Sequence, residues 1–211
     1  MTKIQNPKPY DLEERQYQIV ISGVGGQGVL FITRLLAEAA IEKGLSVFTS
    51  ETHGMAQRGG TVISHLKVGD FASPLINPGK ADGLIALKAE SLVQHGGYLK
   101  PEGWTTVNSP APLEMQAPAK PLYFDADHLA RKMGDPRSVN LIMLGFTLSS
   151  AQRGDCGHGA LHCCLDDVAA VLKNRLKGKA QQLFPQIKVT LATADALLIS
   201  NYCKHYMNEV K

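Results

Sequence analysis

The strongest constraint on the fold is the stretch from residue 18 to residue 33, where an apolar run leads into a glycine-rich turn and then into an apolar-faced helix. Glycines stand at Gly23, Gly25 and Gly28. Because glycine has no Cβ, the backbone there can turn sharply and approach a ligand closely. The first N–H groups of the following helix lack intrahelical partners, and the helix dipole adds positive charge. The pattern predicts a phosphate-binding loop, although a tight strand-to-helix turn can use the same glycines for packing alone.

The order of the predicted elements indicates one α/β domain. A strand at Tyr17–Ser22, a helix at 29–43 and a strand at Leu45–Ser50 predict a β-α-β unit with parallel strands. The alternating strand at Thr61–Val68 is expected to turn His65 towards its less buried face. Further strands are predicted at 83–87, 105–107 and 122–124, and further helices at 89–95, 127–133, 140–150, 165–176 and 193–207.

We therefore predict a single Rossmann-like domain that spans residues 17–211 and follows a polar N-terminal arm, residues 1–16. Its sheet is expected to be mostly parallel and flanked by helices, with extra strands and a helical C-terminal part. At 211 residues the chain can bury a core of its own without disulfides or a structural metal.

Charge and hydropathy exclude two classes of partner at this stage. Lys plus Arg number 22 against 19 for Asp plus Glu, and the basic residues are dispersed, which argues against nucleic acid. Residues 1–15 contain no apolar core of a signal peptide, and no run reaches the ~18 apolar residues of a membrane span. The expectation is a soluble, cytoplasmic protein without a membrane partner.

The end of the second predicted strand offers a rival to a general phosphate site. Glu51 lies about 23 residues after Gly28, close to the place where a dinucleotide-binding fold has its ribose-binding carboxylate. NAD binding is therefore one hypothesis, and a carboxylate that only ends a strand in solvent is the other.

The next loop, residues 52–60, combines a His, a Gln and an Arg with several glycines at the carboxyl end of the same strand, where open α/β sheets collect their ligands. The planar guanidinium of Arg58 suits a phosphate or a carboxylate. The alternative is a surface loop with its arginine in solvent.

The cysteines do not form a recognisable metal or redox motif, because none of the four has the C-x-x-C spacing of zinc or iron–sulfur sites. His158 and His162 are four residues apart and lie among Cys156, Cys163 and Cys164, a combination that can hold a metal on a helix. Gly157 and Gly159 interrupt that helix, so packing is the favoured role and no metal site is predicted.

Several motifs in order resemble one family, the gamma-type domain of 2-oxoacid:ferredoxin oxidoreductases. The resemblance covers about residues 17–180 and rests on Gly23–Val29, His53–Gly60, Ser73–Ile76, Pro78–Asp82 and Asn140–Gly145. Within the family, the segment His53–Gly60 is most similar to the small beta subunit of indolepyruvate ferredoxin oxidoreductase.

The resemblance implies a subunit of an enzyme that decarboxylates a 2-oxoacid on thiamine diphosphate, sends electrons through iron–sulfur clusters to ferredoxin and transfers the acyl group to coenzyme A. This chain lacks the G-D-G and N-N pattern for thiamine diphosphate and magnesium, and it lacks ferredoxin-type cysteine runs. Those groups are expected on a partner subunit, and no catalytic residue is expected here. By resemblance, coenzyme A would be held by Gly23, Gly25, Gly26, Gln27 and Gly28, with Arg58 and Asn140 as neighbours.

Three functions remain open from the sequence. The first is this gamma-type subunit, inactive alone, which docks coenzyme A and assembles with its partner. The others are a free-standing NAD-binding dehydrogenase and a regulatory nucleotide-binding module. If the chain is a subunit, we expect an exposed apolar docking surface near the loop His53–Thr61 and the helix around Asn140, with Met55 and Met143 among its residues.

Overall fold

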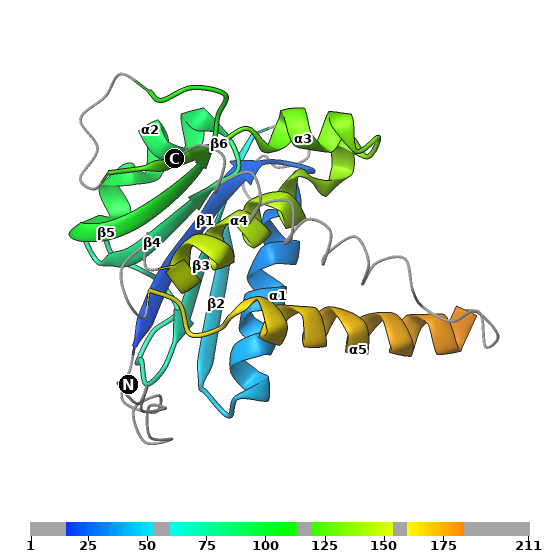
Figure 1. Cartoon of the computed structure of the whole chain (residues 1–211). Coiled ribbons are helices and arrows are strands. Elements are labelled where there is room, and N and C mark those ends of the chain that lie inside the picture. Colours follow the sequence, from blue (N-terminus) through cyan, green and yellow to red (C-terminus); the bar gives the residue numbers. More distant parts are fainter. Residues whose placement is uncertain (1–15, 53–59, 114–119, 154–159, 184–211) are drawn as a thin grey trace, which may run out of the picture.

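The computed structural model describes residues 16–52, 60–113, 120–153 and 160–183. In chain order its elements are β1 (Tyr17–Val24), α1 (Val29–Glu42), β2 (Val47–Thr52), β3 (Thr61–Val68), β4 (Ala81–Ala86), α2 (Ala89–His95), η3 (Gly96–Tyr98), β5 (Leu99–Asn108), β6 (Leu122–Phe124), α3 (Ala126–Lys132), η4 (Pro136–Ser138), α4 (Val139–Arg153) and α5 (Leu165–Leu183). Six strands form a sheet in the order β2-β3-β1-β4-β5-β6, with helices on both of its faces (Figure 1). The predicted α/β fold with flanking helices is confirmed.

The sheet is mixed, and one predicted pairing is wrong. β3 lies between β1 and β2 and is antiparallel to both, so β1 and β2 are not neighbours as the β-α-β prediction required. The physical reason is the short connection at residues 53–60, which leaves no room for a crossover helix and therefore returns the chain antiparallel. On the other side of β1, strands β4, β5 and β6 follow in parallel, as predicted for most of the sheet.

The two faces of the sheet are covered unequally. Helices α1, α4 and α5 pack on one face and contribute most of the larger core, in which Phe124 of β6 stacks on Phe146 of α4 at 4.8 Å between ring centroids. The opposite face carries a smaller apolar cluster under α2 and η3. Helix α5 lies against α1 and extends past it (Figure 1).

His65 lies, as expected, on the less buried face of β3, where Thr61 and Ile63 are partly exposed, but its own side chain is covered. His65 is only 3% exposed, because α2 and η3 cover the face to which it points. Its ring lies edge-on to Tyr98 at 5.3 Å, and its Nδ1 accepts a hydrogen bond from Ile76 N at 3.4 Å. Burial, followed by repulsion from His95 and Lys67, lowers the pKa of His65.

Local signals located the helices well. The helix predicted at 127–133 is α3, and Asp125 caps it by accepting a 2.8 Å hydrogen bond from the N–H of His128. The apolar segment 140–150 forms α4. The predicted helix at 193–207, the polar arm before residue 16 and Met55 lie outside the described residues.

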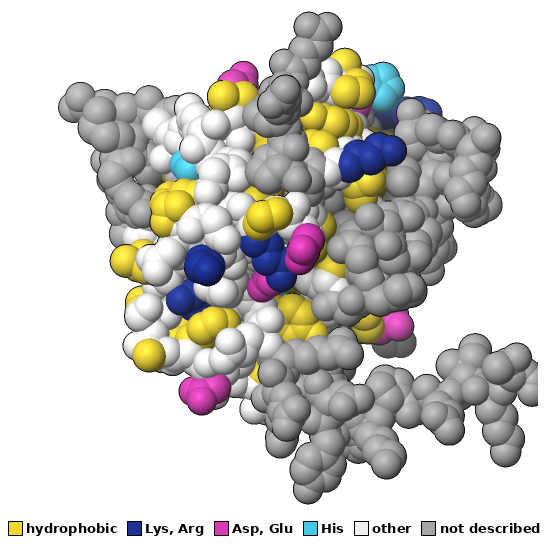
Figure 2. All heavy atoms as spheres, turned by 90° about the vertical axis from the view of Figure 1, so that its left-hand side faces the viewer, with side chains coloured by type: hydrophobic (Ala, Val, Ile, Leu, Met, Phe, Trp, Pro, Cys, Tyr) yellow, Lys and Arg dark blue, Asp and Glu magenta, His cyan; other side chains and the backbone are white. Residues whose placement is uncertain are grey.

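The predicted docking surface needs a correction at α4. Met143 is completely buried in the main core, so it is not available to a partner. The large hydrophobic side chains that are exposed in the described parts of the chain lie on separate elements: Ile41, Phe48, Leu75, Val93 and Met133. Figure 2, which views the molecule from the left-hand side of Figure 1, likewise shows hydrophobic groups interrupted by charged and polar atoms.

Candidate functional site

The glycine-rich stretch forms a turn between β1 and α1 at the carboxyl edge of the parallel strands. Among the described residues, the backbone N–H groups of residues 28–31 have no backbone partner, and the first helical bond runs from Ile32 N to Gly28 O at 3.1 Å. The first turn of α1 also contains no acidic side chain. The helix therefore presents unpaired donors and the positive end of its dipole to the turn. A phosphate group can bind there.

Gly28 brings a second element to this turn. Its φ of +79° is in the left-handed region, and a Cβ at this position would lie 2.1 Å from Nδ2 of Asn140 at the start of α4. Asn140 is oriented by a 2.8 Å hydrogen bond from Leu141 N to its Oδ1. The structure thus brings together Gly28 and Asn140, which are far apart in the sequence, and adds an amide donor beside the helix start.

Gln27 is used inside the turn. Its Oε1 accepts a hydrogen bond from Val24 N at 2.8 Å, and its Nε2 donates to Leu87 O at 3.4 Å. Gly23 leaves the space for this side chain, since a Cβ there would stand 2.9 Å from Gln27 Oε1. Both residues also stabilise the loop through these contacts, and their predicted binding of the cofactor stays a prediction.

The glycine-rich turn also binds Gly60, the last residue of the segment His53–Gly60. Gly25 N donates to Gly60 O at 3.1 Å, so the turn and the start of β3 are held side by side. Gly26 is exposed and lines the cavity beside the turn. Arg58 lies outside the described residues, so its predicted place near the ligand stays a prediction.

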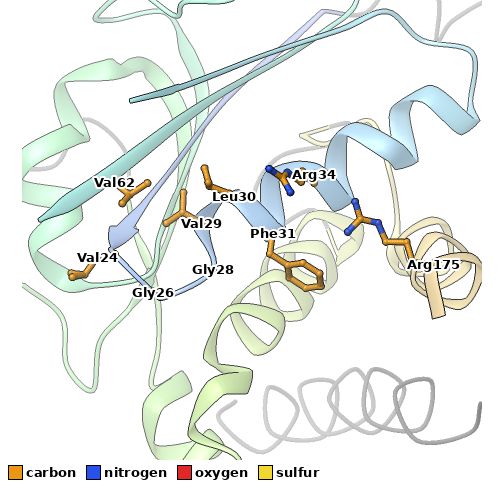
Figure 3. Close-up of a pocket in the computed structure, with 10 residues that line it drawn as sticks. Val24, Gly26, Gly28, Val29, Leu30, Phe31, Arg34, Val62 and Arg175 are labelled. Carbon is orange, nitrogen blue, oxygen red and sulfur yellow. The ribbon is translucent and has the colours of Figure 1, made fainter. Parts of the chain in front are cut away.

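A cavity of about 490 Å³ opens beside the turn and continues along α1 (Figure 3). Its walls are formed by Val24, Gly25, Gly26, Gly28, Val29, Leu30, Phe31, Arg34, Val62 and Arg175. Apart from the two arginines, its side chains are apolar. Arg34 and Arg175 were not identified as candidate site residues from the sequence.

The strand order weakens the NAD hypothesis. A dinucleotide site of the Rossmann type needs its carboxylate on the strand next to β1. Here the neighbours of β1 are β3 and β4, and Glu51 pairs in register with Ser64 on the far side of β3. Glu51 is thus displaced by one strand from the place that the hypothesis requires.

Comparison with known sequences identifies the family. The profile of the family described as "Pyruvate ferredoxin/flavodoxin oxidoreductase" matches residues 18–194, which is most of the chain. The chain belongs to this pyruvate ferredoxin/flavodoxin oxidoreductase family. The predicted family assignment and the assignment as an oxidoreductase subunit are confirmed.

Several members of the oxidoreductase family are similar to the chain in sequence. It is 45% identical to the indolepyruvate oxidoreductase subunit IorB of Archaeoglobus fulgidus over 91 residues, which are 43% of this chain and 45% of that protein. The IorB subunit of Pyrococcus horikoshii is 33% identical over 62% of this chain and 76% of that protein. The matched part of the A. fulgidus subunit is therefore less than half of its length.

Solved structures of family members share the fold. A 2-oxoglutarate:ferredoxin oxidoreductase from Magnetococcus marinus, with 2-oxoglutarate, coenzyme A and succinyl-CoA bound, superposes with a TM-score of 0.66 at 20% identity, over 92% of this chain and 31% of that one. The gamma subunit of a keto/oxoacid ferredoxin oxidoreductase from Geobacter sulfurreducens gives a TM-score of 0.63 at 22% identity, over 89% of this chain and 97% of that one. In the described part of this chain, no helix is both long and apolar enough to cross a membrane.

The described part of the histidine and cysteine cluster, residues 162–164, packs next to α1. His162 is 2% exposed, and its Nε2 lies 2.9 Å from Leu36 O, to which it donates. Cys163 is buried, which raises the pKa of its thiol to about 12. Lys43 binds the carbonyl of His162 at 3.0 Å and the carboxylate of Asp167 at 2.5 Å. These contacts agree with the packing role; Cys156 and His158 lie outside the described residues.

The burial of His162 is expected to make the folded chain less stable in acid. Burial lowers its pKa to about 4 from the usual 6.5, despite the opposing hydrogen bond to Leu36. Between pH 4 and pH 6.5 the unfolded chain therefore binds more protons than the folded chain. The stabilisation that comes from neutral His162 is fully present above pH 6.5 and is lost as the pH falls to about 4. The full effect is about 3 kcal/mol.

Denaturant unfolding from pH 7 to pH 4 measures this effect. His162→Gln, which keeps an N–H donor but does not titrate, should show a much shallower decline. His128→Gln, on the exposed side of α3, should follow the wild type. If His162→Gln declined as steeply as the wild type, another group would be responsible.

Proposed function

We propose that the chain is the coenzyme A-docking subunit of a 2-oxoacid:ferredoxin oxidoreductase that acts on indolepyruvate or a related aryl pyruvate. The observation that carries this proposal is the open start of α1, which lines one end of a cavity, has N–H groups without a partner among the described residues, and lies against the amide of Asn140. The diphosphate of coenzyme A suits this set of donors, because it is anionic and accepts several hydrogen bonds.

The remaining chemistry is assigned to a partner subunit. Thiamine diphosphate with magnesium would supply the decarboxylation of the 2-oxoacid, and iron–sulfur clusters would carry two electrons to ferredoxin. The sequence of this chain has no motif for either group. Its own residues would bind and orient coenzyme A so that the thiol reaches the acyl group held by the partner. In the balanced reaction, one 2-oxoacid anion, one coenzyme A thiol and two oxidised ferredoxins would be consumed, and one acyl-coenzyme A, one carbon dioxide, one proton and two reduced ferredoxins would be formed.

Two comparisons support the proposal. The M. marinus relative contains coenzyme A and succinyl-CoA, and its fold includes the fold of this chain. The IorB relatives carry indolepyruvate in their names, which favours an aryl 2-oxoacid as the substrate of the complex. A cytoplasmic location fits ferredoxin as the acceptor and remains part of the proposal.

Calorimetry on the assembled complex tests the docking role. Coenzyme A should bind and NAD should not, because the strand order removes the carboxylate that a dinucleotide needs. Gly25→Val should weaken coenzyme A binding by about tenfold or more, because the valine side chain fills the space beside the turn. Gly97→Val, at an exposed position with open space around its Cβ, should leave binding unchanged.

The same preparation tests the subunit role. The chain alone should be colourless and unable to reduce a ferredoxin substitute with any 2-oxoacid, whereas the complex should do so. Turnover by the isolated polypeptide, or tight NAD binding that Glu51→Ala abolishes, would contradict the proposal.

A further inference from the structure

The cavity beside the glycine turn does not end at the helix start. It continues along α1 to two arginines, Arg34 on α1 and Arg175 on α5 (Figure 3). Leu30 and Arg34 are one helical turn apart, so they lie on the same side of α1. Since a helix rises 1.5 Å per residue, Arg34 is about 9 Å along the axis from Gly28.

The two arginines have different environments. The guanidinium of Arg175 is bound by Glu38 through two parallel hydrogen bonds, one from Nε to Oε2 at 2.6 Å and one from Nη2 to Oε1. The hydrogen bond to Glu38 raises the pKa of Arg175. This pair is close to neutral as a unit and fixes the far wall of the cavity.

Among the residues that the structure describes, Arg34 has no acidic partner. It is exposed, and it forms no ion pair or side-chain hydrogen bond with any other residue that the structure describes. Glu38, the acidic side chain one turn further along α1, is already bound to Arg175. The cavity therefore has two separate places for negative charge: the start of α1 and the guanidinium of Arg34.

We propose that Arg34 forms a second anionic subsite, which binds the 3′-phosphate of coenzyme A while the diphosphate lies at the start of α1. This proposal rests on the proposed function and adds the group that selects the ligand. The helix start accepts any diphosphate, so it does not distinguish coenzyme A from NAD. A ligand with a third phosphate gains a charge-assisted contact with Arg34, and a ligand with ribose hydroxyls at that place does not.

The test compares coenzyme A with 3′-dephospho-coenzyme A on the assembled complex, by isothermal titration calorimetry at low ionic strength. The wild-type complex should bind the dephospho ligand about tenfold more weakly. Arg34→Gln should weaken coenzyme A by about the same factor and leave the dephospho ligand within about twofold. Arg34→Lys should restore part of the preference, because it keeps the charge and loses the planar fork.

Lys173→Gln is the matched control. It removes the same charge from an exposed position on α5 that does not line the cavity, so the preference for coenzyme A should persist. Equal weakening of both ligands by Arg34→Gln, or no change for either, would overturn the subsite. Binding of neither ligand to the wild-type complex would instead overturn the proposed function on which the subsite rests.

Discussion

Gly28→Ala is expected to destabilise the chain by about 3 kcal/mol and to abolish most of its affinity for coenzyme A. Two effects add at this position. A residue with a Cβ is strained at φ +79°, and the new Cβ would stand 2.1 Å from Asn140 Nδ2. The amide of Asn140 must then move away from the start of α1, which removes a donor from the proposed diphosphate site.

Gly44→Ala isolates the first effect. Gly44 has a φ of +75° and open space around the position of a Cβ, so Gly44→Ala should lower the free energy of unfolding by only about 1 kcal/mol. The double variant Gly28→Ala with Asn140→Ala should recover much of the stability that Gly28→Ala alone loses, because the side chain that clashes with the new Cβ is gone. Denaturant unfolding measures all three, and equal losses for Gly28→Ala and Gly44→Ala would show that Asn140 does not pack on the turn.

Gly83→Ala is expected to have a comparable effect on stability through a different cause. Gly83 lies in the middle of the sheet, and a Cβ there would come within 2.1 Å of two ring atoms of Trp104 on the neighbouring strand β5. The ring is nearly buried and its Nε1 donates to Ala160 O at 3.2 Å. Displacing it breaks that bond and overpacks the core, for which we expect a loss of about 3 kcal/mol.

Trp104 is the chain's single tryptophan, so its fluorescence reports directly on this site. The emission of Gly83→Ala should shift in the folded state, and unfolding followed by circular dichroism should begin at a lower denaturant concentration. Gly97→Ala, with open space around its Cβ, should change neither signal. An unshifted emission with full stability would mean that the ring does not cover Gly83.

Local patterns predicted the elements better than they predicted how the strands pair. The helices predicted at 127–133 and 140–150 depend on neighbouring residues, and both are confirmed as α3 and α4. The pairing of β1 with β3 is a long-range choice, and apolar runs carry no information on which strand becomes the neighbour. One local signal was available: the connection from Thr52 to Thr61 is too short for a parallel crossover.

The candidate site was predictable to a similar extent. Glycine spacing located the turn, and family resemblance added Asn140, which the structure places against Gly28. Arg34 and Arg175 were missed because each is a charged residue on a helix, a common feature of surfaces in general. Only the packing of α5 against α1 brings them to one cavity.

The position of β3 has a consequence for the order of folding. Its pairing with β2 is local in sequence, so this hairpin can form early and with little loss of chain entropy. The pairing of β1 with β4 joins distant segments and must wait for the chain between them to collapse. Since Gly25 N is bound to Gly60 O next to β3, we expect the glycine turn to acquire its final shape only when β1 pairs with the hairpin. We therefore expect the ligand site to be one of the last features to form during folding.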